Sequence, residues 1–185
     1  MTTATLTPFS AFEDARAKAR AAAGAMVPLL AATLHAQFPD ARFLVITRHE
    51  TDYDGDYLRL DSVRGAEGEI VRAFPELLSR AEQLPAVPEE IAALWGAHDP
   101  RDPGAILGLA QRVEDTAPHD FLDFLPERAR TDEEIEGENA GGRTPLGIAL
   151  PCPCGAPGGE CAPCCGSKPC PTVCSGCSTW RPEFH

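Results

Sequence analysis

Apolar side chains recur at steps of three and four residues through the first part of the chain, which is the spacing of one face of an α-helix. The pattern predicts an amphipathic helix over residues 10–38, with Ser10 as its N-cap and a bend at Pro28. The apolar positions are Phe12, Ala15, Ala19, Ala22, Met26, Leu30, Leu34 and Phe38.

Three short segments rich in β-branched and aromatic residues follow this helix. Residues 43–48 (FLVITR) and 57–64 (YLRLDSVR) each predict a strand. A GAEG turn at residues 65–68 leads into a third strand over residues 69–74. We expect the three strands to form an antiparallel meander.

Helical patterns return after the third strand. Residues 75–84 predict one helix, and a second begins near Pro88, because proline suits the first turn of a helix. A third runs from Pro103 or Gly104 to about Val113.

The large apolar side chains that follow are core candidates. Trp95 and the apolar patch at residues 121–125, which contains Phe121 and Phe124, are expected to be buried, and a partner-binding groove is the alternative. The order of one helix, a meander and further helices predicts an α+β domain over residues 1–126.

The composition changes after residue 126. Five acidic residues precede Gly141 and Gly142, so residues 127–150 are interpreted as an acidic linker that contains a flexible glycine pair. The acidic positions are Asp132, Glu133, Glu134, Glu136 and Glu138. Residues 151–185 form a cysteine-rich tail, which we expect to be either ordered by metal or disordered.

The formal net charge is −12, and the surplus lies before the tail, because Lys168 and Arg181 balance Glu160 and Glu183. An acidic surface repels phosphate backbones, so nucleic-acid binding through the body is not expected, whereas a protein partner is possible. The sequence leaves the oligomeric state open.

The N-terminal segment also bears on where in the cell the protein is found. Glu13 and Asp14 and the weak hydropathy of the alanine-rich stretch argue against a secretory signal, and no long apolar run predicts a membrane span. We therefore expect a cytoplasmic protein, in which clustered cysteines favour metal ligation over disulfides.

All eight cysteines lie between Cys152 and Cys177, among proline, glycine and small polar residues. Such a segment cannot bury enough apolar surface to offset the entropy of ordering it, so any order must come from its sulfur atoms. Cys161-x2-Cys164 and Cys174-x2-Cys177 give two thiolate pairs, an arrangement that suits tetrahedral zinc.

Four further cysteines surround these pairs, so that two four-thiolate zinc sites or one bridged cluster are possible. They are Cys152, Cys154, Cys165 and Cys170. Bound zinc would supply the folding energy that the side chains of this segment lack.

The density of cysteines in the tail resembles that of metallothioneins. The Cys152-x-Cys154 pair and the adjacent Cys164-Cys165 also resemble the SEC-C zinc motif, a C-terminal appendage of bacterial proteins, with nine residues between the pairs where the motif has eight. This resemblance implies a zinc site at Cys152, Cys154, Cys164 and Cys165.

Two alternatives remain open for the tail. The chain is also consistent with a ribosomally made precursor of a modified peptide, in which a long leader is cut after Gly142 and the cysteine-rich segment is the core. Alternatively, the tail is a frameshifted or functionless extension, because out-of-frame reading of a GC-rich gene yields Pro, Cys, Gly and Ala in this manner.

No catalytic group is apparent in the body. Three histidines stand next to acids, at His49-Glu50, His98-Asp99 and His119-Asp120, but adjacency in sequence does not make a site, and each histidine is expected in a loop or on the surface. Because the body has no cysteine and no G-x-S-x-G elbow, we expect a protein that is not an enzyme.

Overall fold

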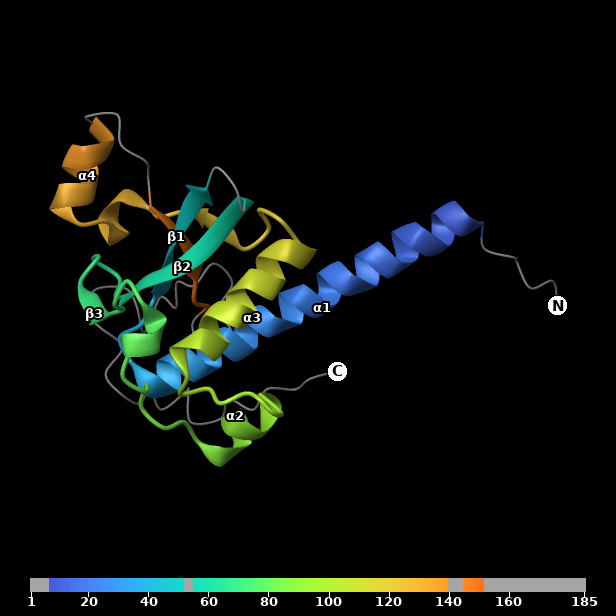
Figure 1. Ribbon diagram of the computed structural model, residues 1–185, viewed down its shortest axis with the longest axis horizontal. Coiled ribbons are helices and arrows are strands. Elements are labelled where there is room, and N and C mark those ends of the chain that lie inside the picture. Colours follow the sequence, from blue (N-terminus) through green and yellow to red (C-terminus); the bar gives the residue numbers. More distant parts are fainter. Residues whose placement is uncertain (1–6, 52–54, 140–144, 152–185) are drawn as a thin grey trace, which may run out of the picture.

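A five-stranded antiparallel sheet forms the centre of the computed structural model, which describes residues 7–51, 55–139 and 145–151 (Figure 1). The strands are β1 (Phe43–Thr51), β2 (Gly55–Arg64), β3 (Ile70–Ala73), β4 (Leu122–Phe124) and β5 (Leu146–Ala149). Their order across the sheet is β3-β2-β1-β5-β4. The expected meander is therefore one part of a larger sheet, and the α+β class is confirmed.

Two helices cover one face of this sheet. Helix α1 (Pro8–Gln37) and helix α3 (Pro103–Thr116) lie side by side, and their buried residues join those of the strands in the main core. The short helix α2 (Glu89–Leu94) ends at Trp95, which is buried as expected and donates a hydrogen bond from Nε1 to Thr33 Oγ1 at 2.8 Å.

A smaller apolar cluster lies on the other face of the sheet. Phe43 and Val45 of β1 pack there with Leu125 and Ala129. Ala129 belongs to the 3-10 turn η2 (Glu127–Ala129), so the chain after β4 crosses to this face. These four side chains are buried on the side of the sheet that α1 and α3 do not cover.

Several helical boundaries differ from the expected ones. Helix α1 begins two residues earlier than predicted, because the Oγ1 of Thr7, not Ser10, caps it by accepting a hydrogen bond from the Ser10 amide. The segment 75–84 contains only the 3-10 turn η1 (Leu78–Arg80). Leu84 instead donates its amide hydrogen to the Arg101 carbonyl, which holds the chain away from a helical path.

The segment that we expected to be a linker carries regular structure. Besides η2, residues 127–150 contain helix α4 (Asp132–Asn139) and β5, while Gly141 and Gly142 lie outside the described residues. Strand β5 pairs with β1 on one side and with β4 on the other. The sheet therefore continues past the boundary expected at residue 126, because LGIA at 146–149 supplies an apolar strand.

The first half of α1 extends away from the rest of the molecule (Figure 1). Residues 8–22 are exposed except for the half-buried Ser10, whereas Ala23 and most of the later apolar positions are buried. No helix within the described ranges is long and apolar enough to cross a membrane.

Candidate functional site

The eight cysteines that we expect to bind zinc lie outside the described residues, but the chain that leads to them is held at well-defined points. Leu150 is buried and donates its amide hydrogen to the Arg42 carbonyl at 2.8 Å. The carbonyl of Pro151 lies 3.1 Å from His35 Nε2. The body therefore holds the chain at the two residues before Cys152.

His35 is a neutral donor in this contact. Its burial lowers its pKa to about 4; the hydrogen bond to Pro151 acts in the opposite direction, and the positive charge of Arg42 lowers the pKa further. A carbonyl oxygen only accepts hydrogen bonds, so the proton of the neutral ring is on Nε2. Near neutral pH, His35 thus links α1 to Pro151 without carrying a charge.

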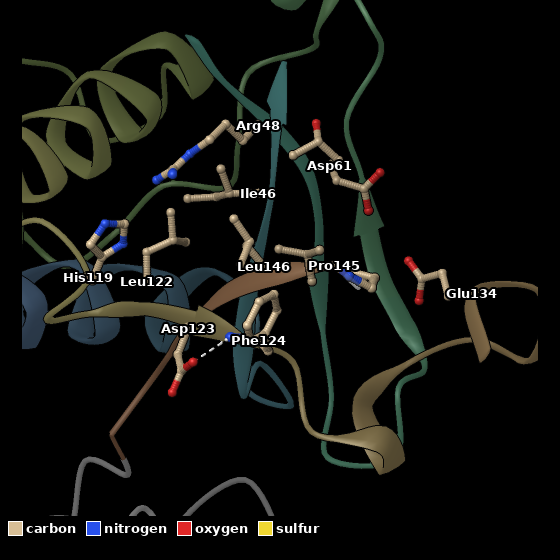
Figure 2. A pocket seen from close by; sticks show the side chains of 12 residues that line it. Ile46, Arg48, Asp61, His119, Leu122, Asp123, Phe124, Glu134, Pro145 and Leu146 are labelled. Atoms are coloured by element: carbon tan, nitrogen blue, oxygen red, sulfur yellow. Dashed lines mark hydrogen bonds between the residues drawn. The ribbon is translucent and has the colours of Figure 1, made fainter. Parts of the chain in front are cut away.

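A groove of about 920 Å³ lies between described side chains of several strands and of the chain around them (Figure 2). It lies beside β1 at the level where β5 begins, since Leu146 of β5 is opposite Ile46 of β1. Its lining residues are Val45, Ile46, Thr47, Arg48, Asp61, His119, Leu122, Asp123, Phe124, Glu134, Pro145 and Leu146.

Apolar side chains make up much of the groove. Phe124 stands beside Pro145 and Leu146 in Figure 2. Phe124 is 65% exposed, which corrects our expectation that Phe124 belongs to the core. The FLDFL pattern places Leu122 and Leu125 in the interior instead, while β4 at the edge of the sheet leaves Phe124 uncovered.

Charged groups on the α3 side of the groove are paired with each other. Arg48 donates from Nη2 to Glu114 Oε1 at 2.8 Å, and the carboxylate of Glu114 is only 10% exposed. The same carboxylate accepts a hydrogen bond from the backbone amide of His119 at 3.3 Å. The imidazole of His119 is 76% exposed and lies 3.7 Å from Glu114, so this histidine is at the surface as expected.

His49 is in a different environment from the one expected. It lies in β1 and is half-buried, with its ring stacked on Tyr57 at a centroid distance of 5.2 Å. Two side-chain atoms of β1, His49 Nε2 and Thr47 Oγ1, are buried without a hydrogen-bond partner in the described part of the chain. Alternation along the strand places both side chains on the same face of the sheet.

Two acids that line the groove, Asp61 and Glu134, pair with a buried arginine that does not itself line it. Arg64 of β2 is 2% exposed and makes two hydrogen bonds to Glu134 of α4, Nη1 to Oε2 at 2.6 Å and Nη2 to Oε1 at 2.7 Å. It also donates to Asp61, Ser62 and the Ala129 carbonyl. Five acceptor contacts thus compensate for the burial of one guanidinium group.

The pKa values of this pair follow from the contacts. Burial on its own would lower the pKa of Arg64, but the hydrogen bonds and charges of Glu134 and Asp61 raise it above its usual value. Burial would raise the pKa of Glu134, yet Arg64 and the Thr131 amide hold it below its usual value. Both groups are therefore charged around neutral pH.

The side chain of Glu134 also caps the N-terminus of α4. It accepts a hydrogen bond from the Thr131 amide at 2.8 Å, and Thr131 Oγ1 accepts one from the Glu134 amide at 3.3 Å. This reciprocal pair is a capping box, whose sequence signature is T-x-x-E. The sequence Thr131-Asp132-Glu133-Glu134 has this signature. We missed it because we interpreted the acidic residues of this segment as solvated charges.

Within the described ranges, no group of three or more His, Cys, Asp or Glu side chains is arranged to hold a metal ion. A scan against known protein families, a search of curated proteins and a search of solved structures found no match for this chain.

Proposed function

We propose that this protein is a non-enzymatic accessory protein in which an α+β domain holds a cysteine-rich, zinc-binding segment. One observation carries the proposal. Hydrogen bonds fix the chain to the described fold at Leu150 and Pro151, and Cys152, the first of the eight cysteines, is the next residue. Residues 1–151 contain no cysteine, so the buried core formed by the described residues contains none.

The spacing of the thiols supports zinc as the metal. Cys161, Cys164, Cys174 and Cys177 form two C-x2-C pairs, and four thiolates complete a tetrahedral shell without protein ligands of another kind. The remaining four cysteines, Cys152, Cys154, Cys165 and Cys170, form a second set of the same size. In the reducing cytoplasm that we expect for this chain, thiolates are available to bind metal.

Metal content of the reduced full-length chain tests the proposal. We expect on the order of one or two zinc ions per chain by elemental analysis. Replacing Cys161, Cys164, Cys174 and Cys177 together with serine should remove the site that the two pairs form. The matched variant replaces the other four cysteines with serine and should retain that site.

The two variants also separate the possible arrangements of the metal. If the sets are independent, each variant loses its own ion and keeps the other. If the ions share thiolates in one cluster, both variants lose more than half of the zinc. Equal and complete retention of zinc in both variants would contradict a thiolate site, as would a full-length chain without metal.

A modified-peptide precursor is the second candidate, and the position of β5 changes where its cut is expected. A cut after Gly142 would leave β5 on the released segment, although β5 lies between β1 and β4 in the sheet. A cut beyond Pro151 would leave the sheet complete and release all eight cysteines. The intact mass of the chain from its native host distinguishes a cut at either place from an uncut chain.

A further inference from the structure

The groove beside β1, β4 and β5 has an exposed aromatic side chain at its edge. Phe124 is 65% exposed, although Leu122, two residues earlier in β4, is buried. Phe124 is opposite Leu146 in the pairing of β4 with β5, and Pro145 lies beside them (Figure 2). The groove's volume of about 920 Å³ is sufficient for two or three large side chains. It is therefore an apolar surface of a size that a short segment of chain can fill.

The cysteine-rich tail contains two aromatic side chains that metal binding does not account for. Residues 178–185 (STWRPEFH) contain no cysteine, so bonds between thiolates and zinc would not bury Trp180 or Phe184. Besides Val173, these are the only large apolar side chains between residues 152 and 185. Burial of both side chains against an apolar surface of the domain would be favourable, because aromatic side chains have large apolar areas.

The sequence pattern around these two side chains suits a groove. Trp180, Pro182 and Phe184 alternate with the charged Arg181 and Glu183. In an extended segment, alternate side chains point to the same side, so the three apolar side chains share one face. Pro182 favours this conformation, because proline disfavours a helical backbone at the residue before it. The segment can thus present an apolar face while its two charged side chains stay in water.

The chain is long enough to bring this segment back to the groove. Pro151 is five residues after Leu146, so it lies at most about 18 Å from the end of β5 that lines the groove. The residues from 152 to 179 span roughly 30 Å on average as a flexible chain. Attachment through this length gives the segment an effective concentration on the order of 1 mM, so even a weak contact would be populated.

We propose that residues 180–184 dock in the groove of the same chain, with their apolar face against Phe124, Pro145 and Leu146. The docked segment would cover Phe124 and close the tail into a loop that begins at Pro151 and contains all eight cysteines. The domain would then hold the cysteine-rich segment at both ends. This contact does not depend on zinc, because no thiol takes part in it.

The two tryptophans of the chain allow a direct test by proton–nitrogen NMR of the reduced full-length protein. Trp95 is buried and donates its indole hydrogen to Thr33, so its indole signal reports whether the domain is folded. Trp180→Phe removes the other indole signal and thereby assigns it. We expect the Trp180 signal to lie away from the position of an indole in water. It should not move on dilution, because docking within one chain is independent of concentration.

Two phenylalanine substitutions test whether the groove is the docking site. Phe124→Ser removes the exposed ring and should weaken docking by about tenfold, which moves the Trp180 signal towards that of an indole in water. Phe12→Ser is the matched control, because Phe12 is 62% exposed on α1, and it should leave the Trp180 signal in place. Phe184→Ser changes the docked segment instead of the domain and should act like Phe124→Ser. The Trp95 signal should stay in place in all three variants.

Three results would overturn the proposal. The first is a Trp180 signal at the position of an indole in water in the unchanged chain. The second is an equal response of this signal to Phe124→Ser and Phe12→Ser. The third is a Trp180 signal that moves on dilution, because the groove would then hold the tail of a second copy.

Discussion

Arg64 on β2 and Glu134 on α4 are joined by two parallel hydrogen bonds of 2.6 and 2.7 Å across 70 positions of sequence. The same glutamate caps its own helix at Thr131. The pair therefore connects the end of the β1–β2 hairpin to the acidic segment that precedes β5.

Removing one partner of this pair should destabilise the domain. Glu134→Gln leaves the buried guanidinium of Arg64 without its main counter-charge, and we expect a loss of about 2–4 kcal/mol in the free energy of unfolding. Glu133→Gln is the matched control, because Glu133 is an exposed acid in the same helical turn, and it should change stability by less than about 0.5 kcal/mol. Urea denaturation measures both; similar effects of the two substitutions would contradict the described role of the pair.

Strand β5 is closely packed in the sheet at Gly147, and a substitution of this glycine tests its position. A Cβ atom at Gly147 would lie 2.6 Å from Leu125 Cδ2 and 3.2 Å from the Leu44 carbonyl oxygen. Because Leu125 is itself buried, Gly147→Ala should cost about 1–3 kcal/mol. Gly108 in α3 has open space at its Cβ position, so Gly108→Ala should stabilise the protein by up to about 1 kcal/mol. A neutral Gly147→Ala in thermal denaturation would place β5 outside the sheet.

Stability should fall as the solution becomes acidic, with His35 as one cause. The pKa of His35 is lowered from 6.5 to about 4 in the folded protein. The unfolded chain therefore binds a proton between pH 6.5 and about 4 that the folded chain does not, and stability declines through this window by up to about 3 kcal/mol. The lowered pKa of Glu134 acts in the same direction, since its contribution is lost as the pH falls below the usual glutamate range.

A non-titrating side chain isolates the contribution of His35. His35→Gln keeps an N–H donor for the Pro151 carbonyl but cannot take up a proton in this range. Chemical denaturation at pH 7, 5.5 and 4.5 should give a shallower decline for His35→Gln than for the unchanged chain. Parallel curves for the two proteins would show that His35 is not held neutral by its burial.

Zinc should not hold the α+β domain together. Residues 1–151 contain no cysteine, and their own apolar side chains form the clusters that join α1, α3 and the sheet. Chelation of the metal, or replacement of all eight cysteines with serine, is therefore expected to change the domain's Tm by less than about 2 °C. A large fall in Tm on chelation would mean that the cysteine-rich segment packs on the domain as part of its fold.

Much of the fold was predictable from local patterns, because the signals were local. The steps of three and four in α1, the β-branched runs of β1 and β2, and Pro103 at the start of α3 each matched an element. The order of the sheet was not predictable in this way. Strand β5 has four residues, follows an acidic run, and pairs with a strand about 100 positions earlier. No local sequence pattern therefore predicts its position between β1 and β4.

The candidate site was predictable to a different extent. The spacing of the thiols pointed to metal chemistry, but the residues that hold the chain beside them, such as His35 and Arg42, carry no motif. Their role arises from contacts with residues that lie more than about 100 positions later in the sequence. The capping box at Thr131 and Glu134 was readable, whereas the partner of Glu134, the buried Arg64, stood in a strand where an arginine is ordinarily expected to face solvent.

Native mass spectrometry of the reduced, full-length chain tests the central proposal most directly. It reports bound metal, disulfides, dehydration and truncation in one measurement. We predict an uncut chain that carries on the order of one or two zinc ions, which are lost on acidification as the thiolates are protonated. A metal-free chain with eight freely titratable thiols would contradict the account.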